Sequence, residues 1–324
     1  MKVFVTGGNG FIGCHVVRIL VASGHQVVCL LRSTSRTERI DGLAFERAAG
    51  DVRDLASIRA GMSRCDCTIH LAAPSSWDND ESLALKQVIE GGIRNVLHVA
   101  SALRGHRVVF VSSTAAINAS DTPQLFDERT AFAVRDPSLR YAHAKHHAEM
   151  QASEAFRRGV PVIIVNPAEV YGPLDTSLVT AGNLIDFAKS NPVLVCRGGT
   201  GVVHVEDVAA GIVAALERGR PGERYILSGQ NISIRQLAAL CLEQLGRQAR
   251  IVTVPNGLVR VLSRIGVRLH LPLPYNPHVV PYATRYWFVD SSKAERELAV
   301  TFRGARETIG STLAWLRETG HLDA

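Results

Sequence analysis

The sequence predicts an α/β fold with a doubly wound parallel sheet, followed by a smaller C-terminal α/β domain. Through the first half of the 324 residues, short and continuously apolar runs alternate with amphipathic stretches. Such runs are typical of parallel strands that helices cover on both faces. In addition, a turn with three glycines, VTGGNGFIG at residues 5–13, joins the first apolar run to the first amphipathic stretch.

The elements of the first half alternate regularly between strands and helices. Apolar runs predict strands at residues 2–7, 25–32, 44–51, 65–73, 106–113 and 160–167. Helical patterns predict helices at residues 11–24, from Asp54 onward, at 81–103 and at 139–158. Gly24 closes the first helix, because glycine readily adopts the left-handed conformation that ends helices.

The second half is less regular, which indicates a second domain. The predicted elements are a helix at residues 202–219, a strand at 223–229 and a helix at 233–246. Asp207 is expected to cap the first of these helices and Ser233 the second. We predict a first domain of residues 1–169, to which 200–230 return, and a smaller domain of 170–199 and 231–324.

Composition excludes several classes of protein. Apolar residues make up 46% of the chain and charged residues 20%, as in ordinary globular proteins. The six cysteines include only one close pair, Cys65 and Cys67, whose spacing is unusual for metal or redox sites, so free thiols in a cytoplasmic protein are expected. Neither a signal-peptide pattern nor a membrane-spanning apolar run is present, so no stable membrane insertion is expected.

The formal charge of +6 suits anionic small molecules. Basic residues are dispersed rather than gathered in a dense run with aromatic residues, which argues against nucleic-acid binding. One basic stripe, Arg260, Arg264 and Arg268, has helical spacing. It could face a membrane or an acidic substrate, or form the solvated face of a lid.

The glycine turn predicts a dinucleotide site. Gly7 would allow the tight turn, Gly10 the close approach of backbone to a pyrophosphate, and Gly13 the packing of helix on sheet. A purely structural turn is the alternative. The position between the first strand and the first helix favours the dinucleotide.

Arg32 at the end of the second strand indicates which dinucleotide binds. NAD sites usually carry an acidic residue there, whereas a guanidinium can clamp a 2′-phosphate, assisted here by Ser33 and Arg36. The sequence therefore favours NADP (NADPH) over NAD, unless Arg32 is only a solvated surface residue. Asp51 after the third strand could accept a hydrogen bond from the adenine amino group.

A candidate catalytic trio follows the fifth strand. Tyr141 and Lys145 are four residues apart and therefore share one helix face. We expect the lysine ammonium to lower the pKa of the phenol, and Ser113 to donate to a substrate carbonyl. A solvated Tyr-x-x-x-Lys face is the alternative, which the glycine turn and Ser113 disfavour.

Taken together, these motifs resemble the extended short-chain dehydrogenase/reductase superfamily, also known as the NAD-dependent epimerase/dehydratase family. The resemblance is to dihydroflavonol-reductase-like and hopanoid-associated sugar-epimerase-like members. The segments that carry it are TGGNGFIG, GDVRD, HLAA, VFVSST, YAHAK, VNPAEVYGP, VHVEDVA and GERYILSG. It implies a Rossmann-type domain, a substrate-binding C-terminal domain and a homodimer.

The resemblance also assigns expected roles to residues. Those at the pyrophosphate are Asn9, Gly10, Phe11, Ile12 and Gly13, and those at the adenine are Asp51 and Val52. Those farther along the cofactor are Leu71, Ala72, Ala73, Tyr141, Lys145, Pro167, Ala168 and Val170. Two positions depart from the family pattern: Ile89 stands where an asparagine is frequent, and Ala144 stands where a serine is common.

The substrate is predicted to be a small organic ketone or aldehyde that the protein reduces with NADPH, Tyr141 donating the proton. Nucleotide-sugar enzymes usually place an arginine before V-x-D-V-A, but none stands between Gly198 and His204. A sugar or nucleotide-sugar epimerase or dehydratase, and a non-catalytic NADP sensor, are the alternatives. Candidate substrate contacts are Trp77, Ser113 and Glu169, although Glu169 could instead pair with an arginine. No metal site is expected.

Overall fold

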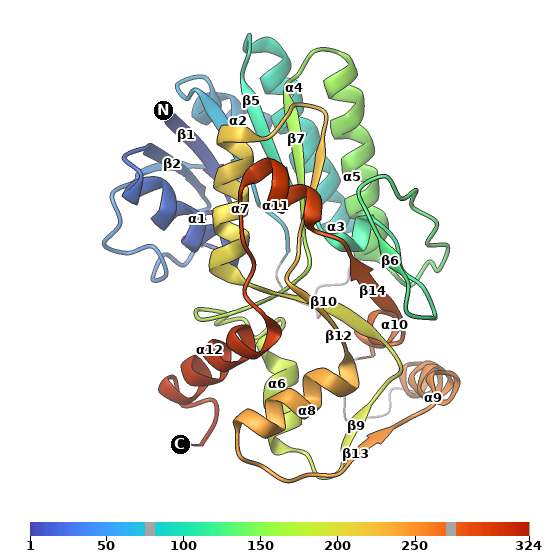
Figure 1. Cartoon of the computed structure of the whole chain (residues 1–324). Helices are drawn as coiled ribbons and strands as arrows, with labels where there is room; N and C mark the ends of the chain where they lie inside the picture. The colour runs from blue at the N-terminus through green and yellow to red at the C-terminus, as the bar shows by residue number, and fades with distance from the viewer. Residues whose placement is uncertain (75–81, 270–276, 324) are drawn as a thin grey trace.

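The computed structural model describes residues 1–74, 82–269 and 277–323, which form a large layered domain above a smaller one (Figure 1). In the large domain, seven described strands form a parallel sheet of order β11-β7-β5-β4-β1-β2-β3. Their bounds are β1 Lys2–Thr6, β2 Gln26–Leu31, β3 Glu46–Ala49, β4 Cys67–His70, β5 Arg107–Val111, β7 Val162–Pro167 and β11 Arg224–Leu227. The predicted doubly wound sheet is confirmed.

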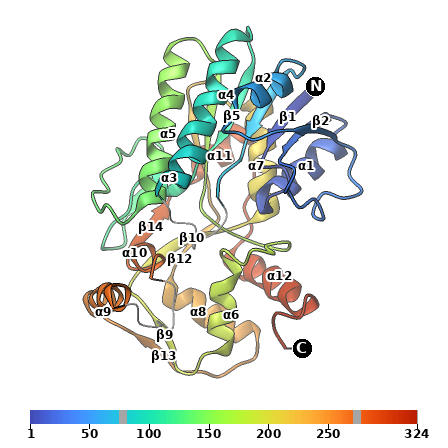
Figure 2. The same cartoon turned by 180° about the vertical axis from the view of Figure 1, so that it is seen from behind.

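Helices cover both faces of this sheet. On one face lie α1 Phe11–Ala22, α7 Val205–Arg218 and α11 Ser292–Leu298 (Figure 1). On the other lie α2 Leu55–Met62, α4 Gly91–Ala102 and α5 Arg140–Arg157 (Figure 2). Alternation along β1 separates the two cores, because Val3 and Val5 pack with the first set of helices and Phe4 with the second.

Local signals place most helix ends where the sequence predicts them. α1 is followed by Gly24 at φ +77°, and Asp54 caps α2 by accepting hydrogen bonds from two backbone N–H groups. Ser233 forms a capping box with Gln236 at the start of α8, Ile234–Gln244. The predicted helix at 81–103 is α3 Ser82–Leu85 and α4, joined by a π-helical turn, Lys86–Glu90.

One predicted cap is wrong. α7 begins at Val205 rather than at residue 202, and the His204 ring accepts from the Glu206 N–H as its N-cap. Asp207 lies inside the helix, where its carboxylate accepts from the Arg303 N–H at 2.8 Å. Residues 202–204 are the last residues of a strand. Because apolar residues continue from this strand into the helix, the sequence pattern does not show where the helix begins.

The smaller domain is built on a second, mixed sheet of order β12-β10-β14-β6, with β8 also paired to β10. These strands are β6 Leu125–Phe126, β8 Glu169–Tyr171, β10 Gly199–His204, β12 Gln230–Ser233 and β14 Tyr286–Val289. A parallel pair, β9 Val193–Val195 and β13 Ile251–Thr253, lies beyond it. Its helices are α6 Ala181–Lys189, α8 Ile234–Gln244, α9 Asn256–Arg268, α10 Val280–Ala283 and α12 Ala305–Glu318.

The chain passes between the two domains more than once. α7 and β11 return to the large sheet, whereas β10 before them belongs to the smaller one, and α11 packs back on α7 and β11. The exact domain boundaries, 1–169 with 200–230 against 170–199 with 231–324, stay a prediction. None of the described helices is long and apolar enough to cross a membrane.

Candidate active site

The glycine turn leaves no room for side chains. Gly7 has φ +73°, and a Cβ on it would lie 2.9 Å from the Ala72 nitrogen. A Cβ on Gly13 would lie 2.0 Å from the Gly7 carbonyl oxygen. Gly10 is the N-cap residue of α1 and makes no side-chain hydrogen bond to the N–H groups of the first helical turn. These groups and the helix dipole form an anion cradle that fits a pyrophosphate.

The loop after β2 folds back to this cradle. Asn9 Nδ2 donates to the Arg36 carbonyl at 2.9 Å, and the Arg32 N–H donates to Ser35 Oγ at 3.0 Å. The Arg32 and Ser33 side chains are exposed. Within residues 1–74, 82–269 and 277–323, no carboxylate is paired with Arg32, so its guanidinium is available to an anionic ligand.

Asp51 and Val52 follow β3 at the same edge of the sheet. Both carboxylate oxygens of Asp51 accept from the Arg53 side chain, at 2.9 and 2.8 Å. This pairing, opposed by partial burial, lowers the pKa of Asp51. Val52 is buried, and its carbonyl accepts from Asn95 Nδ2 at 2.9 Å. Asp51 is therefore an ionised acceptor held in place by Arg53.

The segment Leu71, Ala72 and Ala73 leaves β4 directly beside the glycine turn. The Leu71 N–H donates to the Thr6 carbonyl at 3.1 Å and the Ala72 N–H to Thr6 Oγ1 at 3.3 Å. Thr6 Oγ1 also lies 2.7 Å from His70 Nδ1, and burial lowers the pKa of His70 to about 3. This neutral, buried histidine fixes the geometry of the turn, a role that the sequence analysis did not identify.

The predicted catalytic side chains converge on one place. Tyr141 and Lys145 lie on the inner face of α5, and the Lys145 ammonium is 5.7 Å from the centre of the Tyr141 ring. Ser113 follows β5, with its hydroxyl beside the phenol of Tyr141. Lys145 Nζ donates to the Val111 carbonyl at 2.9 Å, which fixes the ammonium below the phenol.

The pKa of Tyr141 moves opposite to the predicted direction. Burial raises it to about 12, and the Ser113 hydroxyl only partly opposes this. Burial also lowers the pKa of Lys145 to about 8. The prediction of an acidified phenol was wrong because desolvation has the largest effect on the pKa of Tyr141, and the Lys145 ammonium donates to the Val111 carbonyl. Tyr141 is thus a fully protonated phenol at neutral pH.

Three further residues that the sequence analysis missed form a network of hydrogen bonds and an ion pair next to this trio. Asn166 Nδ2 donates to the Ser113 carbonyl at 2.8 Å and to Glu149 Oε1 at 2.6 Å. Glu149, 2% exposed, also pairs with Arg224 at 3.2 Å. Burial raises the pKa of Glu149 against the opposing effect of Arg224. The available signal was the spacing of Glu149, one helical turn after Lys145.

The chain passes from the large sheet to the small one between β7 and β8. This passage contains Pro167, Ala168 and Val170. Glu169 turns toward the smaller domain. Its carboxylate accepts from the Tyr171 hydroxyl at 2.6 Å and from Asn183 Nδ2 at 3.2 Å, and burial raises its pKa. Glu169 pairs with no arginine in the part of the chain that the structure describes.

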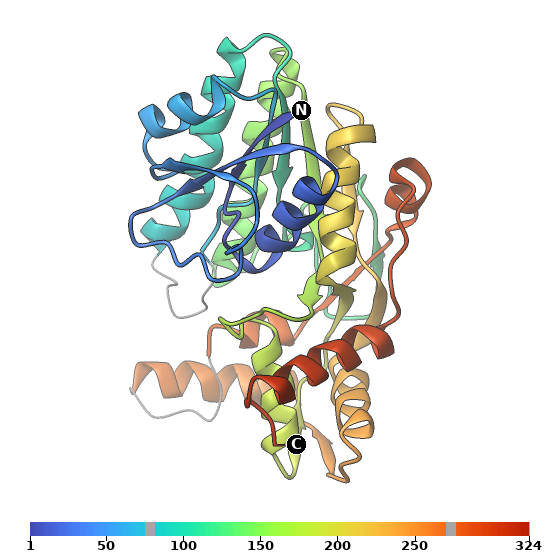
Figure 3. The ribbon, with the colours of Figure 1, turned by 90° about the vertical axis from the view of Figure 1, so that its left-hand side faces the viewer.

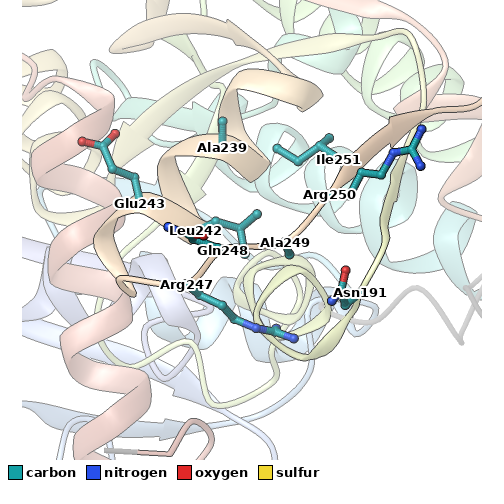
Figure 4. A pocket seen from close by; sticks show the side chains of 9 residues that line it. All are labelled: Asn191, Ala239, Leu242, Glu243, Arg247, Gln248, Ala249, Arg250 and Ile251. Atoms are coloured by element: carbon teal, nitrogen blue, oxygen red, sulfur yellow. The ribbon is translucent and has the colours of Figure 1, made fainter.

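Trp77 lies outside the described residues. Across the described ranges, no three His, Cys, Asp or Glu side chains gather as metal ligands would. A shallow groove of about 590 Å³ lies on the smaller domain, lined by residues such as Leu242, Arg247 and Ile251 (Figure 4). It contains none of the predicted site residues and is separate from the catalytic trio.

Comparison with known proteins agrees with this geometry. Residues 3–228 match the profile described as the NAD dependent epimerase/dehydratase family. The chain is 32% identical to a putative dihydroflavonol 4-reductase of Synechocystis sp., over 98% of this chain and 95% of that protein. It is 30% identical to 4-hydroxy-2-methyl-3-oxo-4-farnesyl-3,4-dihydroquinoline-1-oxide ketoreductase of Stigmatella aurantiaca, over 99% of this chain and 97% of that protein.

A solved structure shares the fold. The crystal structure of a dTDP-glucose 4,6-dehydratase from Streptomyces venezuelae, with NAD bound, superposes with a TM-score of 0.79. It covers 98% of this chain and 97% of the dehydratase at 23% identity. The likeness therefore extends over both domains.

Proposed function

The chain belongs to the NAD-dependent epimerase/dehydratase family of extended short-chain dehydrogenases/reductases, and on this basis we propose that it reduces a ketone or aldehyde with NADPH. The observation that carries the proposal is the meeting of Ser113, Tyr141 and Lys145 at the sheet edge that also bears the glycine cradle. Two curated relatives that cover nearly the whole chain are named reductases.

The trio has the chemistry that carbonyl reduction needs. NADPH, when bound, supplies a hydride to the carbonyl carbon. The Ser113 hydroxyl donates a hydrogen bond to the carbonyl oxygen, and Tyr141 gives that oxygen its proton as negative charge develops there. A phenol with its pKa at about 12 stays protonated at neutral pH, as a donor must. The alcohol forms, and Tyr141 is reprotonated from solvent.

NADPH rather than NADH is proposed because of the charge at the end of β2. Arg32 occupies the position after the last residue of β2, Leu31, and its exposed guanidinium could form a bidentate contact with a 2′-phosphate. Arg36 and Ser33 lie in the same loop. Arg32 is, after Arg53, among the charges that lower the pKa of Asp51, which supports an adenosine site between the ends of β2 and β3.

The substrate is proposed to be a small, weakly charged organic carbonyl compound. No arginine lies on β10 to meet a diphosphate. A farnesyl-bearing compound is part of the name of one relative, the Stigmatella ketoreductase, and is consistent with an apolar substrate. A sugar epimerase or dehydratase is the second candidate, which the family description favours.

The test is NADPH oxidation with a panel of aldehydes and ketones of increasing apolar length. The protein is expected to consume NADPH and form the alcohol in equal amounts. Tyr141→Phe should leave NADPH binding nearly intact and lower kcat by about 10²–10⁴-fold. The control is Tyr225→Phe, which removes another buried phenol, one bonded to Glu297, and should remain active. A fully active Tyr141→Phe would refute the role.

Epimerisation of a sugar without net NADPH consumption would favour the second candidate.

A homodimer is also proposed, supported by the family resemblance and by Met150, whose side chain on α5 is 56% exposed. Sedimentation of the wild type against Met150→Glu tests it, since the variant should be monomeric.

A further inference from the structure

α9 exposes an apolar face that no described part of the chain covers. Leu258, Val261, Leu262, Ile265 and Leu269 are 47–60% exposed. Their spacing of three, four, seven and eleven residues from the first places all five side chains on one side of the helix axis. Leu269 follows the last residue of α9, and its N–H still donates to the Ile265 carbonyl at 2.9 Å. Five large apolar side chains in a row are unusual on a surface that meets only water.

The opposite side of α9 is anchored, so this face is held outward. Val259 and Ser263 are buried. Asn256 Nδ2 donates to the Arg197 carbonyl at 2.7 Å, and Arg260 Nε donates to Thr284 Oγ1 at 3.0 Å. Figure 3 shows the orange helix α9 extending sideways from the smaller domain, below the large one.

Arginines border the apolar face along one side. Arg264 and Arg268 are exposed, one turn apart, and each lies three residues from an apolar member of the face. Among the residues that the structure describes, neither has an acidic partner, whereas Arg260 pairs with Asp121 at 3.3 Å. The apolar face and two free guanidinium groups therefore point into solvent together.

The surrounding sequence carries the entire charge excess of the protein. Residues 244–289 contain six arginines and no lysine, aspartate or glutamate. The remaining 30 basic residues are matched by the 30 acidic residues of the chain, so its formal charge of +6 is located here. Two of the six arginines, Arg260 and Arg285, pair with Asp121 and Asp136. The exposed Arg264 and Arg268 therefore favour a partner that carries negative charge beside an apolar layer.

We propose that α9 docks on the surface of an anionic phospholipid bilayer. Helices that lie in the interface combine an apolar face with flanking arginines, which remain at the headgroups while the apolar side chains enter the acyl boundary. A second copy of the chain fits less well, because an antiparallel symmetric contact through this face would place the two arginine rows on the same side of the interface. The contact is reversible and at the surface, without a spanning helix.

Co-sedimentation of the full chain with vesicles tests the proposal. The wild type should bind vesicles of equal parts phosphatidylglycerol and phosphatidylcholine, weakly at high salt, and should not bind pure phosphatidylcholine. Arg264→Gln with Arg268→Gln should weaken binding by about tenfold or more, given the attraction of each basic residue to an anionic surface. Leu262→Glu with Ile265→Glu should abolish it.

The matched control is Arg104→Gln with Arg317→Gln, which lowers the net charge equally at exposed positions outside α9 and should bind as the wild type does. Equal loss in this control would overturn the proposal in favour of non-specific charge attraction. The proposal would also be overturned if the α9 variants bound vesicles as well as the wild type does. It would equally be overturned if the wild type were a dimer that Leu262→Glu with Ile265→Glu converts to a monomer. Reduction of a water-soluble carbonyl should be unaffected in all variants, so failure of this proposal is distinguishable from failure of the proposed reductase function.

Discussion

Replacing Gly13 by alanine should damage the cofactor cradle while leaving the catalytic trio in place. The added Cβ would lie 2.0 Å from the Gly7 carbonyl oxygen and 2.9 Å from Gly8 Cα. Ordinary contact begins at 3.4 Å, so the Cβ falls short of it by about 1.4 Å. Both contacted atoms are backbone, so α1 must move away from the turn rather than a side chain rotating aside.

Overpacking of this kind costs about 1–3 kcal/mol. If opening of the cradle relieves the strain, this free-energy cost weakens cofactor binding, and the Kd of NADPH rises by about 5- to 150-fold. Titration of NADPH by its fluorescence measures this, and thermal unfolding measures the part of the cost that falls on the fold. kcat at saturating NADPH should change little, because Ser113, Tyr141 and Lys145 lie on other elements.

Gly24→Ala is the matched control. Gly24 has a positive φ, +77°, and a Cβ there meets nothing within 4 Å, so its substitution tests backbone strain without a clash. It should cost about 1–2 kcal/mol of stability through backbone strain and leave the NADPH Kd unchanged. An unchanged Kd in Gly13→Ala, or an equal rise in Gly24→Ala, would contradict the placement of the pyrophosphate at this turn.

Three further predictions concern charge and protonation. Arg32→Gln should raise the Kd of NADPH about tenfold to a hundredfold and leave that of NADH unchanged, and equal effects on both cofactors would contradict the clamp. Glu149→Gln should lower the pKa of Lys145 further, because the charge of Glu149 raises that pKa. The alkaline limb of the kcat/KM profile should therefore move to lower pH. A loss of activity with an unshifted pH profile would indicate a merely structural role for Glu149. Burial lowers the pKa of His70 from 6.5 to about 3, so between these values the unfolded chain binds a proton that the folded chain does not. Stability should therefore fall as the pH drops below 6.5, and His70→Gln should make the denaturation midpoint less dependent on pH in this window.

The correct part of the sequence analysis rests on local patterns. Apolar runs and helical periodicity identify the strands and helices of the large domain, and parallel strands bring their carboxyl ends to one edge. The sequence could therefore predict that the glycine turn, Arg32 and Ser113 lie along the same edge of the sheet. Four-residue spacing likewise put Tyr141 and Lys145 on one face of α5.

Errors arise where partners come from distant segments. The cap of α7 depends on β10 continuing to His204, and Asp207 is instead bound to the backbone of Arg303, 96 residues away. The direction of the Tyr141 pKa depends on how deeply α5 packs, because desolvation has the largest effect on that pKa. Neither burial nor partner choice is a local property.

The sequence by itself determined the sheet and the glycine turn and pointed to Tyr141 as the candidate proton donor, because backbone periodicity and glycine geometry act over a few neighbouring residues. Only the tertiary structure decided the protonation of that donor and the partners of Glu149, because desolvation and ion pairing sum over every element packed around a group. It also decided which side of α9 faces outward, since Asn256 and Arg260 fix the helix through Arg197 and Thr284.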